Sequence, residues 1–330
     1  MTTSKRTEPA QDGSGVTFAQ LFEEFLTLSE ARGRSPTTLH SYRTVIAGFW
    51  LPELGSMHLS ELTAHTLDTL YAGMLTRQNP VAPSTVRKYH AILSAALSQA
   101  VKWQWISTNP ARLATLPASE HIGPVTPTPQ QVRALISACM SESEVLGVFV
   151  LVAAVTGCRR GELAALRWCD YEGQALHVKG SAYNVGRLKG IKSTKTGRQR
   201  RVAVLGSLVE TLAGWKTRCE ARASDVGVPY GPECFIFSAG PDGLSPININ
   251  TVSSSFRRVA TSLDLPSVHV HSLRHFAATE LISSGVDPRT AASRLGHANP
   301  SMTLRIYAHA TSESELRAAE VAATVLDDLA

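Results

Sequence analysis

The stretch VLGVFVLVAAVTGCRRGELAALRW, residues 145–168, decides the fold of this chain, because an apolar segment passes into a charged turn within it. Its first part, residues 145–157, is apolar on all sides of a helix, which predicts a buried central helix. Gly157 is a residue at which such a helix can end. Arg159 therefore follows directly on the end of a helix in the core of a domain.

The totals of the chain permit two domains. A length of 330 residues is long for one domain, and a hydrophobic share of 43% is enough for two cores. No apolar run reaches the length of a membrane span, and the first residues lack the apolar stretch of a signal peptide. The five cysteines are odd in number and lack CxxC spacing, which argues for a reducing compartment and against disulfides and a zinc site. We therefore expect a cytoplasmic protein without membrane contact.

Residues 17–115 are predicted to form a small bundle of four helices. The first helix starts at a capping box of Thr17 and Gln20. The second starts with Ser35 as its N-cap and Pro36 in its first turn. The third and fourth are predicted from apolar periodicity over residues 61–75 and 84–103.

A proline-containing linker with little apolar content, residues 116–127, separates this bundle from a second domain at residues 128–310. The second domain starts at a capping box of Thr128 and Gln131. Short alternating runs broken by glycines between residues 168 and 204 predict a small β-sheet. The expected fold is mainly α with a small β-sheet, in which a helical domain precedes a mixed α/β domain.

The two ends of the chain are predicted to differ. Residues 1–16 contain almost no apolar side chains and are expected to form a disordered tail that cannot bury a core. Residues 311–330 contain a capping box of Ser312 and Glu315 and an apolar face, which predicts a short amphipathic helix. That face must be buried either on the helix's own domain or on a neighbouring protomer.

The run RLKGIKSTKTGRQRR, residues 187–201, holds seven basic residues and no acidic one. It fits either a solvated surface loop or a contact with a phosphate backbone. On the second interpretation, the residues expected to contact DNA are Arg187, Lys192, Arg198, Arg200 and Arg201. In the helical domain the corresponding candidates are Arg43, Arg87 and Lys88.

Five short stretches of the second domain carry residues that are able to perform chemistry. TGCRRGELAALRW has Arg159, TKTG has Lys195, HSLRH has His271 and Arg274, LGHAN has His297, and IYAHA has Tyr307. The HxxR spacing puts two of these side chains on one face of a helix. Each residue alone also has a structural explanation, such as a helix cap, a solvated turn, a surface polar pair, a hydrogen-bonded core histidine or core packing.

Taken together and in this order, the five stretches resemble the tyrosine recombinases, also called the phage integrase family. The resemblance extends from about residue 17 to about residue 325. It implies that residues 17–115 are a core-binding, SAM-like domain and that residues 128–310 are a catalytic domain. The catalytic residues that it implies are Arg159, Lys195, His271, Arg274, His297 and Tyr307, with Glu162 as a supporting acid. Arg160 stands next to Arg159, so the assignment between the two depends on the register of the motif.

The reaction that the resemblance implies is phosphoryl transfer at a DNA phosphodiester, with neither metal nor cofactor. The phenol of Tyr307 attacks phosphorus and forms a 3′-phosphotyrosyl link. Arg159 and Arg274 stabilise the charge on the non-bridging oxygens, because guanidinium presents a fixed fork of donors. His271 and His297 donate hydrogen bonds to the phosphate, and His271 also accepts the tyrosine proton. Lys195 protonates the leaving 5′-oxygen, and its basic neighbours lower its pKa.

The family also implies the partners. These are double-stranded DNA attachment sites, a homo-tetramer on synapsed DNA in which the C-terminal helix docks on a neighbour, and a directionality factor. Because residues 1–16 cannot fold alone, we expect a phage-type integrase of the simple kind, which acts on core-type sites without an arm-binding domain. A chromosome-dimer resolvase or a transposon recombinase is the alternative within the family. A type IB topoisomerase and a catalytically silent DNA-binding regulator are more distant alternatives.

Overall fold

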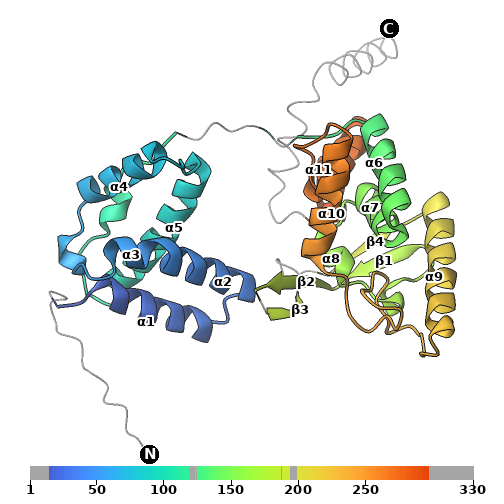
Figure 1. Ribbon diagram of the computed structural model, residues 1–330, viewed down its shortest axis with the longest axis horizontal. Coiled ribbons are helices and arrows are strands. Elements are labelled where there is room, and N and C mark those ends of the chain that lie inside the picture. The colour runs from blue at the N-terminus through green and yellow to red at the C-terminus, as the bar shows by residue number, and fades with distance from the viewer. Residues whose placement is uncertain (1–14, 119–122, 124, 187, 194–198, 297–330) are drawn as a thin grey trace, which may run out of the picture. The chain divides into compact units, whose positions relative to one another are not determined.

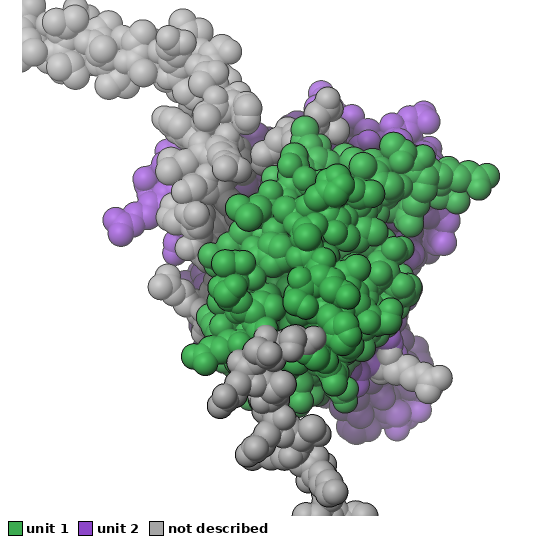
Figure 2. Space-filling view, turned by 90° about the vertical axis from the view of Figure 1, so that its left-hand side faces the viewer, with its two compact units in different colours: residues 1–122 green, residues 123–330 purple. Residues whose placement is uncertain are grey.

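The computed structural model describes residues 15–118, 123, 125–186, 188–193 and 199–296. The chain divides into two compact units, residues 1–122 and 123–330 (Figures 1 and 2). Each unit has its own hydrophobic core. The units are therefore described separately.

Unit 1 consists of helices packed around a core of large apolar side chains, among them Phe18, Phe22, Trp50 and Leu97. Its α-helices are α1 (Phe18–Ala31), α2 (Pro36–Val45), α3 (Leu51–Leu54), α4 (Ala64–Thr76) and α5 (Pro83–Lys102). Short 3-10 turns lie at Leu59–Glu61 and Pro110–Leu113. The helical bundle predicted from apolar periodicity is confirmed.

The predicted starts of the first two helices are confirmed. Thr17 and Gln20 form the reciprocal capping box of α1. The Ser35 hydroxyl accepts a hydrogen bond from the amide of Thr38 at the start of α2, and Pro36 stands in the first turn. The predicted helix over residues 61–75 starts later, at Ala64, because the Thr63 hydroxyl caps α4.

A π-helical turn, Ile46–Trp50, joins α2 to α3 and was not predicted. The amide of Leu51 donates to the carbonyl of Ile46, five residues back. The following residue is Pro52, which has no amide hydrogen to donate. The wider turn thus lets the chain stay helical past a proline.

Unit 2 is built around α7, the buried helix predicted from residues 145–157. The α-helices of this unit are α6 (Pro129–Glu142), α7 (Glu144–Thr156), α8 (Arg160–Ala164), α9 (Ser207–Asp225), α10 (Ile249–Ser262), α11 (Val270–Ser283) and α12 (Pro288–Leu295). Helix α7 packs against α6 and α11, and most of its residues are buried, although Val155 is exposed (Figure 1). The capping box of Thr128 and Gln131 at α6 is also confirmed.

Within the described residues, the strands form two separate antiparallel pairs rather than the one small sheet expected. β1 (Ala175–Val178) pairs with β4 (Arg200–Ala203), and β2 (Gly180–Val185) pairs with β3 (Leu188–Ser193). Part of the basic run is therefore strand and not loop. Successive side chains of a strand point to opposite faces, so Arg200 lies on the inner face with Val202, whereas Arg201 is exposed.

The end of α7 brings three helices close together. Gly157 has a left-handed φ of 64°, and a Cβ atom at this position would lie 2.3 Å from Leu295 Cδ2 and 3.1 Å from Ala277 Cβ. Glycine therefore allows α11 and α12 to approach the C-terminus of α7. Among the residues that the structure describes, no helix combines the length and the apolar composition needed to cross a membrane.

Candidate active site

Arg159 is the N-cap residue of α8 and lies in the short turn between α7 and α8. Its amide donates to Glu162 Oε2 at 2.8 Å, and its Nη1 donates to Glu162 Oε1 at 2.7 Å. Glu162 is only 1% exposed. The neighbouring Arg160 is exposed and bonds to the Ser253 hydroxyl. The geometry thus separates the two adjacent arginines, and Arg159 is the one that faces the buried carboxylate.

Arg200 reaches the same carboxylate from β4. Its Nη2 donates to Glu162 Oε2 at 2.7 Å, and its Nη1 donates to Glu162 Oε1 at 3.1 Å. Burial acts to raise the pKa of Glu162, but the hydrogen bonds from Arg200 and Arg159 outweigh it and hold the pKa below its usual value. The side chain of Arg200 is only 10% exposed. The prediction that Arg200 contacts the DNA backbone is not tested by these contacts, but its donors face the protein interior.

Arg274 is the buried cation of the site. It lies on α11, is 3% exposed, and donates through Nη1 to Gly157 O at 2.8 Å and to Leu295 O at 2.6 Å. Its Nη2 is buried and has no hydrogen-bond partner among the described residues. Burial and the nearby Arg159 lower the pKa of Arg274 to about 10. A buried guanidinium that has a donor without a partner and no ion pair among the described residues is suited to bind an anion.

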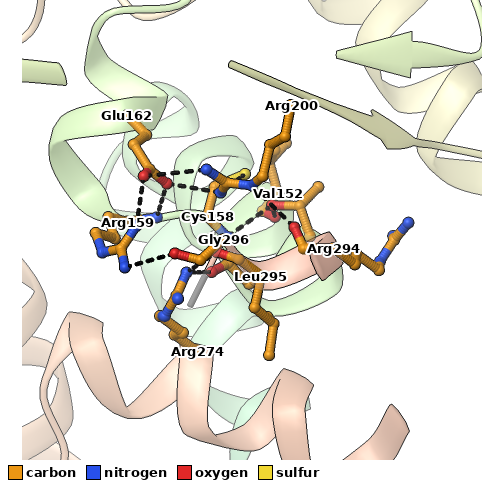
Figure 3. Close-up of polar contacts among 11 residues, drawn as sticks. Val152, Cys158, Arg159, Glu162, Arg200, Arg274, Arg294, Leu295 and Gly296 are labelled. Carbon is orange, nitrogen blue, oxygen red and sulfur yellow. Dashed lines mark hydrogen bonds and ion pairs between the residues drawn. The ribbon is translucent and has the colours of Figure 1, made fainter. Parts of the chain in front are cut away.

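Three arginines hold the C-terminal end of α12 through successive carbonyls (Figure 3). Arg200 Nε donates to Arg294 O at 2.9 Å, Arg274 Nη1 donates to Leu295 O, and Arg159 Nη2 donates to Gly296 O at 3.0 Å. The last carbonyls of a helix lack partners within it and carry its negative dipole. The arginines satisfy these carbonyls and are fixed by them in return.

His271 lies one turn before Arg274 on α11. The ring stacks edge to face with His275, with 4.9 Å between ring centroids. Although the residue keeps exposed surface, partial burial of its ring, followed by the effects of His275 and Arg274, lowers its pKa to about 4. His271 is therefore neutral near pH 7, with an unprotonated ring nitrogen, although the low pKa makes it a weak base in the free protein.

The sequence profile of the phage integrase family matches residues 127–314, which is more than half of the chain. The chain belongs to the phage integrase family. The match covers the α7–α8 junction, β4, α11 and the end of α12, which carry the site described above.

Individual relatives agree with this assignment. The ICEBs1 integrase of Bacillus subtilis (strain 168) is 26% identical over 204 residues, which is 61% of this chain and 54% of that protein. The integrase of Mycobacterium phage L5 is 27% identical over 260 residues, 77% of this chain and 66% of that protein. The chain thus spans little more than half of the first relative and just under two thirds of the second.

Solved structures show the same fold. The Tn1549 transposon integrase, solved in complex with transposon right end DNA, superposes with a TM-score of 0.77 at 20% identity and covers 93% of this chain and all of that one. A lambda integrase dimer bound to a core site gives a TM-score of 0.66 at 20% identity, with coverage of 87% and 97%. These likenesses show the fold alone.

The structure of this phage integrase family member brings together three of the six predicted catalytic residues, Arg159, His271 and Arg274, beside Glu162. The other three predicted catalytic residues and two of the DNA-binding candidates lie outside the described residues: Lys195, His297, Tyr307, Arg187 and Arg198. Among the described residues, no cluster of three or more His, Cys, Asp or Glu side chains is suited to hold a metal ion.

The remaining DNA-binding candidates are at or near the surface. Arg201 and Lys88 are exposed, and Lys192 is half-buried, with its ammonium group 5.9 Å from the ring centre of Tyr183. Arg43 forms an exposed ion pair with Glu30, and Arg87 donates to the Pro117 carbonyl at 2.7 Å. Both of these arginines therefore already have partners within the unit.

Unit 1 also contains a basic cavity that the sequence analysis missed. The cavity has a volume of about 160 Å³, and its lining includes Arg32, Arg34, Lys102, Ser98 and Gln99. Arg32 Nη1 donates to Gln99 Oε1 at 3.2 Å. Within the described part of the chain, none of the three cations forms an ion pair. Arg32 and Arg34 are close together in the sequence. Lys102 is the last residue of α5, about seventy positions later, and lies beside them only in the folded unit.

Proposed function

We propose that this chain is a site-specific DNA recombinase of the phage integrase type, which cleaves and rejoins DNA through a 3′-phosphotyrosyl intermediate. The observation that carries the proposal is the buried Nη2 of Arg274, which lacks a partner among the described residues and stands beside Arg159. A non-bridging phosphate oxygen is the acceptor that such a forked, desolvated cation binds best. Family membership supports the same reading.

The charge of the site suits the transition state of phosphoryl transfer. Three guanidiniums, Arg159, Arg200 and Arg274, surround the carboxylate of Glu162, which leaves two positive charges. Attack on a phosphodiester raises the charge of the phosphoryl group from about −1 to about −2 as the transition state forms. The cluster therefore matches the transition state better than the bound substrate, which is what lowers the barrier.

The protein groups divide the proton transfers in this proposal. His271 is neutral near pH 7, since its pKa is about 4, and a bound phosphate anion raises that pKa and so favours uptake of the proton of the attacking phenol. We assign the phenol to Tyr307, the leaving-group proton to Lys195, and a second phosphate hydrogen bond to His297. These three roles are carried over from the family motifs.

Unit 1 is proposed to be the core-binding domain, residues 17–115, followed by the linker 116–127 and the catalytic domain 128–310. The cavity of Arg32, Arg34 and Lys102 supports a contact with the DNA backbone, because three cations that form no ion pair with any described residue surround a polar hollow. We further propose that the protein acts on nucleoid DNA in the cytoplasm as a homo-tetramer. The C-terminal segment 311–330 then docks on a neighbouring protomer, and a directionality factor acts as a further partner.

A second function within the same family is a transposon recombinase. The observation that favours it is the sequence similarity to the transposase from transposon Tn916 of Enterococcus faecalis, which is 24% identical over 259 residues, 72% of this chain. The active-site chemistry is identical in the two cases, so only the DNA sites distinguish them. Mapping of the cleaved DNA therefore tests both readings at once.

The test is covalent capture of DNA. The full chain is incubated with a pool of genomic duplexes that carry randomly placed nicks, because a nick beside the scissile phosphate traps the tyrosyl adduct. Adducts that survive denaturation are isolated and their DNA ends are sequenced. We expect a shared site, no adduct with Tyr307→Phe, and strongly reduced adduct with Arg159→Lys. Adduct formation by Tyr307→Phe would move the nucleophile, and the absence of any adduct from the unmodified chain would overturn the proposed function.

A further inference from the structure

Arg200 has more hydrogen bonds within the protein than we expect for an arginine that contacts DNA from a basic strand. All three of its guanidinium nitrogens donate within the protein, to Glu162, to Arg294 O and to Cys158 Sγ. The contact with the thiol is 3.5 Å long. Its side chain thus joins β4, the start of α8 and the end of α12 at one point (Figure 3).

Glu162 is saturated only because Arg200 is present. Each carboxylate oxygen accepts one hydrogen bond from Arg159 and one from Arg200. Without Arg200, Arg159 is the one of these two arginines that remains to balance the negative charge of Glu162. The carboxylate of Glu162 would then neutralise the positive charge of Arg159, and less of that charge would be available to bind a phosphate.

A second contact fixes where Arg200 lies. Gly296 has a left-handed φ of 71°, and a Cβ atom there would stand 2.8 Å from Arg200 Nη1 and 3.0 Å from its Cζ. The guanidinium therefore packs directly on the bare backbone of the residue whose carbonyl accepts from Arg159. A displacement of Arg200 disturbs both groups that hold Arg159, namely Glu162 and the end of α12.

We propose that Arg200 is a positioning residue for phosphoryl transfer, which shares the charge of Glu162 so that Arg159 stays oriented and fully cationic toward the scissile phosphate. Arg200 does not touch the phosphate itself. This inference rests on the proposed recombinase function. It assigns to the buried arginine of the basic run an electrostatic role in catalysis in place of a contact with DNA.

The other groups that face Glu162 are known for the described part of the chain. They are Cys158 and Arg159 at the α7–α8 junction, Arg274 on α11, and, around a cavity of about 340 Å³ that Glu162 borders, Arg167, Asp170, Lys179 and Lys192. The test leaves all of these unchanged. Any altered pH dependence then reports on Glu162 itself.

The experiment measures the rate of adduct formation on a nicked duplex of the site mapped for the unmodified chain. Four variants are compared: Arg200→Met, Arg200→Lys, the double variant Arg200→Met/Glu162→Gln, and the control Arg258→Met. The control removes an arginine of the same unit that pairs with Glu142 at the surface, where such pairs contribute little. DNA binding by each variant is measured in parallel, so that the rate refers to bound complex.

We expect Arg200→Met to cleave roughly 10²-fold more slowly, comparable to the loss of one preorganised donor. Arg200→Lys restores part of the rate. The double variant recovers at least about tenfold over Arg200→Met, because removal of the carboxylate returns the cluster to two positive charges. The control keeps its rate. A merely structural role predicts the opposite for the double variant, which then loses a second set of buried hydrogen bonds and is no faster than Arg200→Met.

A pH series gives a second readout. In Arg200→Met, Glu162 loses a cationic partner and its pKa rises, so protonation frees Arg159 as the pH falls. The rate of Arg200→Met relative to the unmodified chain should therefore increase from about pH 8 to about pH 5.5. A flat ratio together with an unrecovered double variant overturns the inference. If Arg200→Met does not fold, the rates of Arg200→Lys and of the double variant decide whether the inference holds. Failure of the unmodified chain to form any adduct instead refutes the proposed function.

Discussion

At the residue scale, the site depends on the direction in which each guanidinium points. Arg159 and Arg160 are neighbours, as are Arg200 and Arg201, yet one member of each pair turns to Glu162 and the other turns to the surface. Alternation along a strand explains the second pair, and the start of a helix explains the first. Composition alone cannot separate them, because all four are arginines in basic surroundings.

The first prediction concerns Arg274. Arg274→Lys should reduce the rate of adduct formation by roughly 10²–10³-fold. A single ammonium cannot hold Gly157 O and Leu295 O while it keeps a second, forked donor for the phosphate. Arg160→Lys is the matched control, because that arginine is exposed and its hydrogen bond within the described part of the chain is to the Ser253 hydroxyl. Equal losses in the two variants, both of which keep the positive charge, would show that the buried site of Arg274 has no special need for a guanidinium.

The second prediction concerns His271. Its pKa lies at about 4 in the folded chain, below the ordinary value of 6.5. Between these values the unfolded chain binds a proton that the folded chain refuses, so the free energy of unfolding should fall as the pH drops from about 6.5 to about 4. His271→Gln should flatten this dependence, as measured by urea unfolding across the range. An unchanged slope means that His271 titrates normally in the folded chain.

At the element scale, the sequence predicted what local signals control. The capping boxes at Thr17 and Thr128 and the buried helix α7 follow from a few neighbouring residues, and the structure confirms them. The π-helical turn before Pro52 and the split into two sheets depend on packing and on strand partners far along the chain. For the same reason, the inward position of Arg200 could not be predicted, since its acceptors lie on α8 and α12.

The third prediction tests the end of α12. Gly296→Ala should destabilise the fold by roughly 1–2 kcal/mol through its left-handed φ, and by roughly 1–3 kcal/mol more because the new Cβ displaces the guanidinium of Arg200. Adduct formation should fall with it. Gly285→Ala is the control, because Gly285 has a φ of 80° and open space around it, so only the backbone cost applies. Urea unfolding measures both variants, and equal losses would mean that Arg200 moves away without cost.

At the scale of the whole molecule, the net charge of +5 does not indicate which surface binds DNA, because only some of the basic side chains are exposed and without acidic partners in the described part of the chain. Several of the conspicuous ones face inward or pair with acids: Arg200 holds Glu162, Arg43 holds Glu30, and Arg258 holds Glu142. The cations around the unit 1 cavity have no such partners within the described residues. The proposed contact of unit 1 with DNA therefore rests on a cluster that forms only in the fold, where the residues after α1 lie beside the end of α5.

The last prediction follows from that cluster. If Arg34 and Lys102 each neutralise a phosphate, Arg34→Gln/Lys102→Gln should lower the slope of log Kd against log salt by roughly 2, since each contact releases about 0.9 counterion. Arg32 is left intact because it also holds Gln99. Arg112→Gln, an exposed arginine of the same unit, controls for general loss of charge. Fluorescence anisotropy on the mapped duplex across a salt series measures the slope. If the slope matches that of the control, the cavity is excluded as a phosphate site. If the slope falls only in the double variant, the cavity of unit 1 binds the DNA backbone.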